Sequence, residues 1–199
     1  HADLQAAADK AGRPFRVMAD GDTPPAAAFP APTPDAVAGE LTECALLYTS
    51  GTTGRPKGCI LPNRYFLHAG DWYAKVGSLA ELRPGQERMI TPLPLVHMNA
   101  MAYSAMAMIL TGGCLIPLDR FHPRSWWDNV RDSRATVVHY LGVMPAMLMK
   151  AAPSANDRKH SVRFGFGAGV DRSLQASCEE RFGFPLLEAW AMTETGAGA

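Results

Sequence analysis

The sequence lacks an excess of charge, a paired cysteine motif and a long hydrophobic run. Lys and Arg total 19, and Asp and Glu also total 19, so the chain has no basic excess of the kind that binds nucleic acid. No C-x-x-C pair or His/Cys cluster with metal-site spacing occurs. The longest apolar stretch, Met98 to Leu110, is shorter than the ~20 residues that cross a bilayer. These absences argue against nucleic-acid binding, a cysteine-based metal site and an integral membrane segment.

The four cysteines are scattered along the chain. Three of them, Cys44, Cys59 and Cys114, lie in or beside apolar runs, and Cys178 stands alone. This pattern predicts buried free thiols in a reducing compartment. The first residues do not resemble a signal peptide. The sequence therefore predicts a cytoplasmic location.

The order of apolar segments predicts the fold class. With 199 residues the chain is long enough for one domain with a substantial core. The predicted strands are 88–91, 114–116, 136–140, 163–166 and 186–189, and the predicted helices are 63–82, 101–110, 122–134, 145–152 and 174–182. Their alternation predicts an α/β fold, a mostly parallel sheet with helices on both faces. Ligands of such sheets bind beyond the carboxyl ends of the strands.

The first part of the chain carries no recognisable chemistry. Residues 1–11 are alanine-rich and predict a short helix, 15–18 predicts a short strand, and 23–34 contains five prolines and predicts an extended loop. We therefore divide the chain into a lead-in over 1–40 and a main subdomain over 41–199.

The most informative stretch is Tyr48-Thr49-Ser50-Gly51-Thr52-Thr53-Gly54-Arg55-Pro56-Lys57-Gly58. Glycines allow the backbone to approach a ligand, successive N–H groups bind anions, and the hydroxyls and Lys57 add donors and charge. The stretch predicts a hairpin whose loop binds a polyphosphate. The alternative is an ordinary surface turn, which has no need of four hydroxyls and a lysine in this order. It is not a Walker loop, because Pro56 precedes Lys57 and Gly58 follows it.

This stretch resembles the phosphate loop of the adenylate-forming superfamily, which includes acyl-CoA synthetases, luciferases and peptide-synthetase adenylation domains. The resemblance runs from about Cys44 to Ala199. Within the superfamily, the segment 135–157, which ends in Pro153-Ser154-Ala155-Asn156-Asp157, is most similar to crotonobetaine/carnitine–CoA ligases. The resemblance implies that the loop holds the β- and γ-phosphates of ATP. The residues assigned to this role are Thr49, Ser50, Gly51, Thr52, Thr53, Gly54 and Lys57.

Three later segments match the superfamily in the expected order. The resemblance places His97, at the end of Pro92-Leu93-Pro94-Leu95-Val96, at the acyl-carboxylate pocket and the thiol tunnel. It places the adenine ring against Gly167, Ala168 and Gly169. Taken without the superfamily, the histidine would be a structural residue and the glycines a strand-to-helix turn.

The third segment is Trp190-Ala191-Met192-Thr193-Glu194, where the superfamily usually has Tyr-Gly-Met-Thr-Glu. The resemblance implies that Trp190 stacks on adenine, Thr193 contacts the α-phosphate and Glu194 holds Mg²⁺. Ala191 departs from the usual glycine. Without the superfamily, Glu194 would be read as a solvated acid in a polar turn. The residues implied to act in catalysis are Lys57, His97, Thr193 and Glu194.

The resemblance implies an enzyme that joins a small carboxylic acid to coenzyme A with ATP and Mg²⁺. Two alternatives stay open: transfer to a carrier-protein thiol, and a nucleotide-binding piece without turnover. Superfamily members are longer, with a ribose-binding aspartate and a mobile domain that carries a lysine after the Thr-Glu motif. We therefore expect this chain to be a fragment that is inactive alone. The acid and the oligomeric state, a homo-oligomer included, are left open.

Overall fold

The computed structural model of this protein describes residues 2–12, 21–22, 37–50 and 54–196. The chain divides into two compact units, 1–38 and 39–199. In the first unit, helix α1 (Ala2–Lys10) forms where a short helix is predicted. The predicted strand 15–18 and the proline-rich loop 23–34 lie outside the described residues.

The second unit contains a five-stranded parallel sheet with the strand order β4-β3-β5-β6-β7. Its strands are β3 (Arg88–Thr91), β4 (Cys114–Pro117), β5 (Val137–Leu141), β6 (Phe164–Ala168) and β7 (Leu186–Glu188). The helical elements of the unit are α2 (Asn63–Lys75), η1 (Ser78–Ala80), η2 (Asn99–Ala105), α3 (Met106–Thr111), α4 (Trp126–Asp132), α5 (Val143–Met149) and α6 (Arg172–Phe182). The predicted α/β fold is confirmed.

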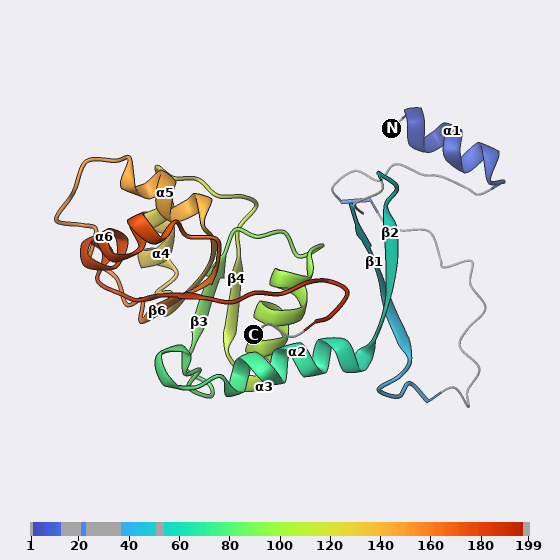
Figure 1. The fold of residues 1–199 in the computed structure, drawn as a ribbon, viewed down its shortest axis with the longest axis horizontal. Helices are drawn as coiled ribbons and strands as arrows, with labels where there is room; N and C mark the ends of the chain where they lie inside the picture. Colours follow the sequence, from blue (N-terminus) through green and yellow to red (C-terminus); the bar gives the residue numbers. More distant parts are fainter. Residues whose placement is uncertain (1, 13–20, 23–36, 51–53, 197–199) are drawn as a thin grey trace. The chain divides into compact units, whose positions relative to one another are not determined.

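Helices cover both faces of the sheet, and each face has its own core (Figure 1). Alternate strand residues point to opposite faces. On β3, Met89 packs with the cluster formed by α2, η2 and α3, whereas Ile90 packs with the cluster formed by α4, α5 and α6. On β5, Val137 and Val138 divide between the two faces in the same way. Burial on both sides explains why the strands read as continuous apolar runs.

An antiparallel hairpin precedes the sheet. Strand β1 (Glu43–Thr49) pairs with β2 (Lys57–Pro62), which confirms the predicted hairpin around the phosphate-loop stretch. Its outer face exposes apolar side chains, with Leu46, Tyr48 and Ile60 all more than half exposed.

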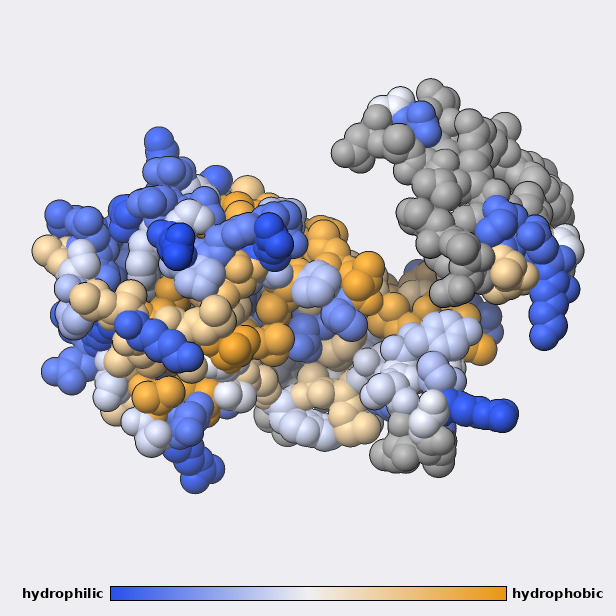
Figure 2. Space-filling view, turned by 90° about the horizontal axis from the view of Figure 1, so that it is seen from above, coloured by the Kyte–Doolittle hydropathy of each residue, from blue (hydrophilic) through white to orange (hydrophobic). Residues whose placement is uncertain are grey.

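Figure 2 shows hydrophobic residues gathered towards the centre of one face, and mostly hydrophilic residues at the end that holds α5 and α6.

Several predicted helix boundaries are wrong. The predicted helix 63–82 is α2, which ends at Lys75, followed by the separate turn η1, because Gly77 adopts a φ of +69° that breaks the helix. Asn63 does not cap α2. Its side chain donates to the Gly39 carbonyl instead, and Pro62 occupies the capping position.

The predicted helices 101–110 and 122–134 also differ from the structure. The first begins at Asn99 as the π-helix η2 and continues as α3, which ends before Gly112, a glycine in the left-handed conformation. The second begins only at Trp126, as α4. A π-helix has a wider turn than an α-helix and often occurs at functional sites.

Two glycines allow β5 and β6 to approach closely at their carboxyl ends. Gly142 has an ordinary φ of −55°, but a Cβ atom there would lie 1.7 Å from the Gly169 carbonyl oxygen. A Cβ atom on Gly167 would lie 2.2 Å from the Tyr140 carbonyl oxygen. Packing of backbone on backbone therefore requires glycine at both positions.

The four cysteines are free thiols, as predicted. Their predicted burial holds for Cys178 in α6. It is wrong for Cys44, which is exposed on the hairpin, and Cys59 and Cys114 are only partly buried. Among the described helices, none combines the length and apolar character needed to cross a membrane.

Candidate functional site

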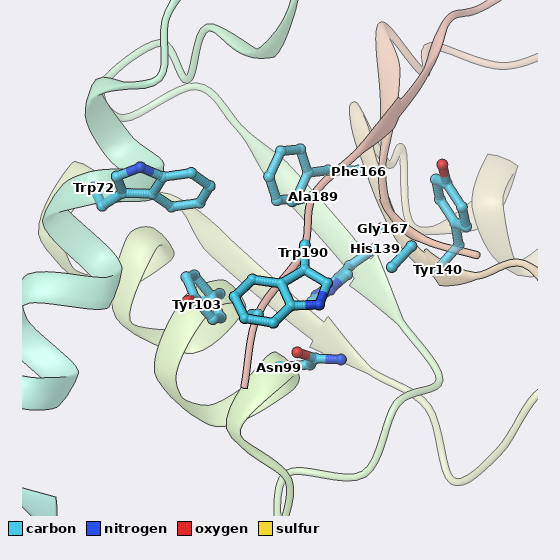
Figure 3. Close-up of a pocket in the computed structure, with 11 residues that line it drawn as sticks. Trp72, Asn99, Tyr103, His139, Tyr140, Phe166, Gly167, Ala189 and Trp190 are labelled. Carbon is cyan, nitrogen blue, oxygen red and sulfur yellow. The ribbon is translucent and has the colours of Figure 1, made fainter. Parts of the chain in front are cut away.

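A cavity of about 120 Å³ opens at the carboxyl ends of β5, β6 and β7 (Figure 3). This is the edge of the sheet at which the α/β fold predicts a ligand. Its walls come from α2, η2 and the three strand ends. The lining residues are Trp72, Asn99, Tyr103, His139, Tyr140, Phe166, Gly167, Ala168, Ala189, Trp190 and Ala191.

Three of the predicted adenine-site residues line this cavity. Gly167 and Ala168 form the end of β6, and Trp190 follows β7 with its side chain 57% exposed. An exposed indole beside a glycine-lined strand end offers a flat surface to a planar ring. Gly169, the remaining residue of the predicted adenine segment, is adjacent and has a φ of +82°.

The glycine turn is held by Glu188, which the sequence analysis missed. One carboxylate oxygen of Glu188 accepts a hydrogen bond from the Gly169 N–H at 3.0 Å, and the other accepts from the Val170 N–H at 2.9 Å. The Tyr140 hydroxyl donates to the same carboxylate at 3.3 Å. Glu188 therefore sets the conformation of the turn next to the cavity. Its only sequence signal is an acidic residue at a strand end.

Thr193 and Glu194 lie in a tight turn in which Met192 pairs with Gly196. Thr193 is partly buried and Glu194 is exposed. The Tyr103 hydroxyl, from the cavity wall, donates to the Gly196 carbonyl and so ties this turn to the cavity.

The carboxylate of Glu194 also affects the pKa of a neighbouring tyrosine, Tyr65. Burial raises the pKa of the Tyr65 hydroxyl, and the neighbouring Tyr103, Cys59 and Glu194 raise it further. Among the described residues, no group of three His, Cys, Asp or Glu side chains could hold a metal. A lone exposed carboxylate fits Mg²⁺ because this ion is commonly bound by one or two carboxylates together with substrate phosphates and water.

The structure describes the base of the phosphate-loop stretch, on either side of residues 51–53. Thr49 and Lys57 pair across the hairpin, and Ser50 and Lys57 are exposed at its open end. Gly54 has a φ of +80°, a conformation that favours glycine. The predicted ligands Gly51, Thr52 and Thr53 lie outside the described residues.

His97 is not among the residues that line the cavity. It is exposed in the turn before η2, where its carbonyl accepts a hydrogen bond from the Met101 N–H. Asn99, two residues later, does line the cavity. The predicted role of His97 at the acyl carboxylate stays a prediction.

A second pair that the sequence analysis missed lies at the back of the cavity. His139 on β5 is 4% exposed, and its Nδ1 forms a hydrogen bond with the Ser104 hydroxyl of η2. Burial lowers the pKa of His139 to about 4, so the ring is neutral at physiological pH. The sequence of this segment predicts an apolar strand, and a histidine within it carries no distinguishing signal.

The fold and cavity define an α/β domain with a cavity at the carboxyl edge of a parallel sheet. A comparison with protein families matches residues 3–199 to the AMP-binding enzymes. The chain belongs to this family.

Curated relatives include crotonobetaine/carnitine–CoA ligases. The protein from Shigella sonnei (strain Ss046) is 33% identical over 154 residues, and that from Escherichia coli O45:K1 is 32% identical over the same length. Each match covers 77% of this chain and 29% of the relative. The chain thus spans less than a third of the length of these relatives.

Solved structures support the same family. O-succinylbenzoate coenzyme A synthetase from Bacillus subtilis, in complex with AMP, has a TM-score of 0.66 and 26% identity, covering 81% of this chain and 40% of that one. A complex of the same synthetase with ATP and magnesium has a TM-score of 0.67 and 25% identity, covering 81% and 32%. The N-terminal domain of FACL13 from Mycobacterium tuberculosis, at 22% identity and a TM-score of 0.65, covers 75% and 36% and shares the fold.

Proposed function

We propose that the enzyme containing this chain activates a small carboxylic acid with ATP and transfers the acyl group to coenzyme A. The observation that carries the proposal is one cavity with two kinds of wall. Gly167, Ala168 and Trp190 form the side predicted to bind adenine, and Asn99 and Tyr103 of η2 form the side that we assign to the acyl group. A site that joins an acid to a nucleotide needs both walls within reach of one reacting phosphorus.

In the first half-reaction, a carboxylate oxygen attacks the α-phosphorus of ATP. A new oxygen–phosphorus bond forms, the bond to the β-phosphate oxygen breaks, and pyrophosphate leaves. Lys57 and the hairpin loop would bind the β- and γ-phosphates, and Thr193 would orient the α-phosphate. Mg²⁺, held by Glu194, would offset the charge on the phosphates. These groups act by positioning and by charge stabilisation.

In the second half-reaction, the thiol sulfur of coenzyme A attacks the acyl carbon, and AMP leaves with the electron pair of the broken bond. His97 is proposed to lie where the thiol arrives, in keeping with its exposed place before η2. Residues 41–199 would form the nucleotide-binding subdomain, and residues 1–40 a lead-in to it.

Acid-dependent pyrophosphate release tests the first half-reaction, and thioester formation tests the second. The purified enzyme is supplied with ATP, Mg²⁺ and single acids, with and without coenzyme A. Pyrophosphate release that requires an acid, and a thioester that requires coenzyme A, would support the proposal. ATP binding with no turnover on any acid would instead favour a nucleotide-binding protein.

A carrier-protein thiol is the second candidate acceptor. Coenzyme A is preferred because the curated relatives are coenzyme A ligases. If the adenylate forms but coenzyme A does not discharge it, a phosphopantetheinylated carrier protein is the next acceptor to test.

Lys57→Ala is expected to lower kcat/KM for ATP by about tenfold or more, because a hydrogen bond to a charged group contributes about 1.5–3 kcal/mol. The loss for the acid should be smaller, because Lys57 acts on phosphate charge. Initial rates of pyrophosphate release at varied ATP and varied acid measure both effects. Lys75→Ala is the control, since Lys75 is exposed on α2 and pairs there with Asp71. Equal losses for both substrates in a folded variant would indicate a structural role for the hairpin.

Glu188→Ala is expected to raise the KM for ATP severalfold while the protein stays folded. The change leaves the Gly169 and Val170 N–H groups without their acceptor, so the turn beside the adenine wall loses its fixed conformation. Steady-state kinetics and the midpoint of thermal unfolding are measured together. Glu180→Ala, an exposed change on α6, is the control. An unchanged KM for ATP would remove Glu188 from the nucleotide site.

A further inference from the structure

His139 is a buried polar side chain on the wall of the cavity. Figure 3 shows it reaching in from β5 behind the indole of Trp190. Its Nδ1 is occupied by the Ser104 hydroxyl. No described residue forms a hydrogen bond with its Nε2.

The hydrogen-bond pattern assigns the tautomer of His139. A neutral imidazole carries one proton, on either Nδ1 or Nε2. Within the described residues, the Ser104 hydroxyl has no acceptor other than Nδ1. If Nδ1 carried the proton, the buried hydroxyl hydrogen of Ser104 would lack an acceptor, which is costly. Ser104 therefore donates to Nδ1, and Nε2 carries the proton and faces the cavity as a donor.

The other side chains of the cavity determine which acceptors are available to the Nε2–H of His139. Among the described residues, the lining contains no Asp, Glu, Lys or Arg, and its large side chains are aromatic, with Trp72, Phe166 and Trp190 among them. The Tyr103 hydroxyl is already engaged with the Gly196 carbonyl. Asn99 is only partly buried, so water can satisfy its amide. The His139 ring is 4% exposed and lines the cavity, and its Nε2–H has no partner among the described residues, so it is available to an acceptor on a ligand.

The volume limits the size of the ligand. An apolar cavity of about 150 Å³ holds a molecule of benzene, and this cavity measures about 120 Å³. The part of it beside His139 and η2 therefore suits a compact acyl group, because the side formed by Gly167, Ala168 and Trp190 is assigned to adenine.

We propose that the enzyme prefers a compact acid whose acyl group carries a hydroxyl or carbonyl oxygen, and that the Nε2 proton of His139 binds this oxygen. The inference rests on the proposed function for the identity of the ligand as an acid. Ser104 is a positioning residue, because it acts through the tautomer of His139. A buried donor that finds no partner rejects analogues that lack the acceptor.

Matched pairs of acids of equal size test the preference. Each hydroxybenzoate is compared with the methylbenzoate substituted at the same position, and 3-hydroxybutyrate with 3-methylbutyrate. Quenching of tryptophan fluorescence measures the Kd, since Trp72 and Trp190 line the cavity. One of the two acid classes, benzoates or butyrates, will fit the cavity better and have the lower Kd. Within that class, the acid with the hydroxyl should bind at least about tenfold more tightly than the acid with the methyl group.

Variants of His139 and Ser104 test whether His139 causes the preference for the oxygen-bearing acid. His139→Phe keeps a ring but removes the donor, and should abolish the discrimination between the members of a pair. His139→Gln offers an N–H again and should restore part of it. Ser104→Ala should reduce it, because Nδ1 is then free to take the proton. His68→Phe, an exposed change on α2, should leave it unchanged.

Two outcomes would overturn the inference: methyl partners that bind as well as the oxygen-bearing acids, or discrimination that persists unchanged in a folded His139→Phe variant. The fluorescence titration requires no turnover, so it reports on this inference separately from the proposed function. Tight, selective binding without pyrophosphate release would support the cavity assignment and contradict the proposed reaction. Acid-dependent pyrophosphate release without selective binding would support the proposed reaction and contradict the cavity assignment.

Discussion

Glu194→Gln is expected to reduce acid-dependent pyrophosphate release by about 100-fold or more at saturating Mg²⁺. The amide has nearly the same shape as the carboxylate but lacks the charge that a hard cation prefers in its ligands. Removing one group that stabilises charge in a transition state costs about 10²–10³ in kcat. Glu194 is exposed in the 192–196 turn, so its replacement should leave the fold intact.

Pyrophosphate exchange into ATP measures this effect, because it reports the first half-reaction alone. The midpoint of thermal unfolding confirms that the variant is folded. Glu43→Gln is the matched control: it makes the same chemical change at an exposed position, opposite Pro62 at the far end of the hairpin from the phosphate loop. Near-normal exchange in Glu194→Gln at any Mg²⁺ concentration would remove Glu194 from the metal site.

Glu87→Ala is expected to destabilise the sheet by about 3 kcal/mol. The Glu87 side chain is fully buried, and its carboxylate accepts from the Arg83 Nε at 2.7 Å and from Arg163 and Thr136. Breaking a buried ion pair costs about 3–5 kcal/mol because the partner charges are left without compensation. The lower end of that range applies here, since the Arg83 and Arg163 side chains are 38% and 29% exposed.

The network explains why one residue has so large an effect. Glu87 precedes β3, Thr136 precedes β5 and Arg163 precedes β6, so the carboxylate joins three strands at their amino ends. Burial by itself raises the pKa of Glu87, but hydrogen bonds from Arg83 and Thr136 and the charge of Arg163 outweigh it and lower the pKa below its usual value. The stabilisation is therefore present above the pKa of the unfolded chain, about 4.3, and is lost as the pH falls through the folded-state pKa.

Thermal unfolding at pH 7 and at lower pH measures both effects. The midpoint for Glu87→Ala should fall by about 6–12 °C at pH 7, and the gap to the unmodified enzyme should narrow below pH 4. Glu81→Ala, an exposed change six residues earlier, should shift the midpoint little. Because the network lies at the amino edge of the sheet, Glu87→Ala should leave the KM for ATP nearly unchanged below the melting range. A gap that stays constant with pH would contradict the role of the carboxylate charge.

The family and the fold class could be predicted from the sequence because their signals are local. A motif such as Thr49-Ser50-Gly51 through Lys57 is a run of adjacent residues whose backbone and side chains act together, and buried parallel strands are continuous apolar runs. Helix ends were less predictable. The end of α2 depends on the conformation of Gly77, and the π-helical form of η2 has no marker in its sequence.

The sequence by itself determined the α/β class, the family, and the segments that bear Gly167, Trp190 and Glu194. Only the tertiary structure decided which side chains meet. Glu188 reaches the Val170 N–H across 18 residues, Ser104 meets His139 across 35, and Arg163 meets Glu87 across 76. Each pairing depends on the order β4-β3-β5-β6-β7, which brings strand ends together that are distant in the chain. A buried donor or carboxylate finds its partner in space, and a pattern of neighbours along the sequence does not contain that information.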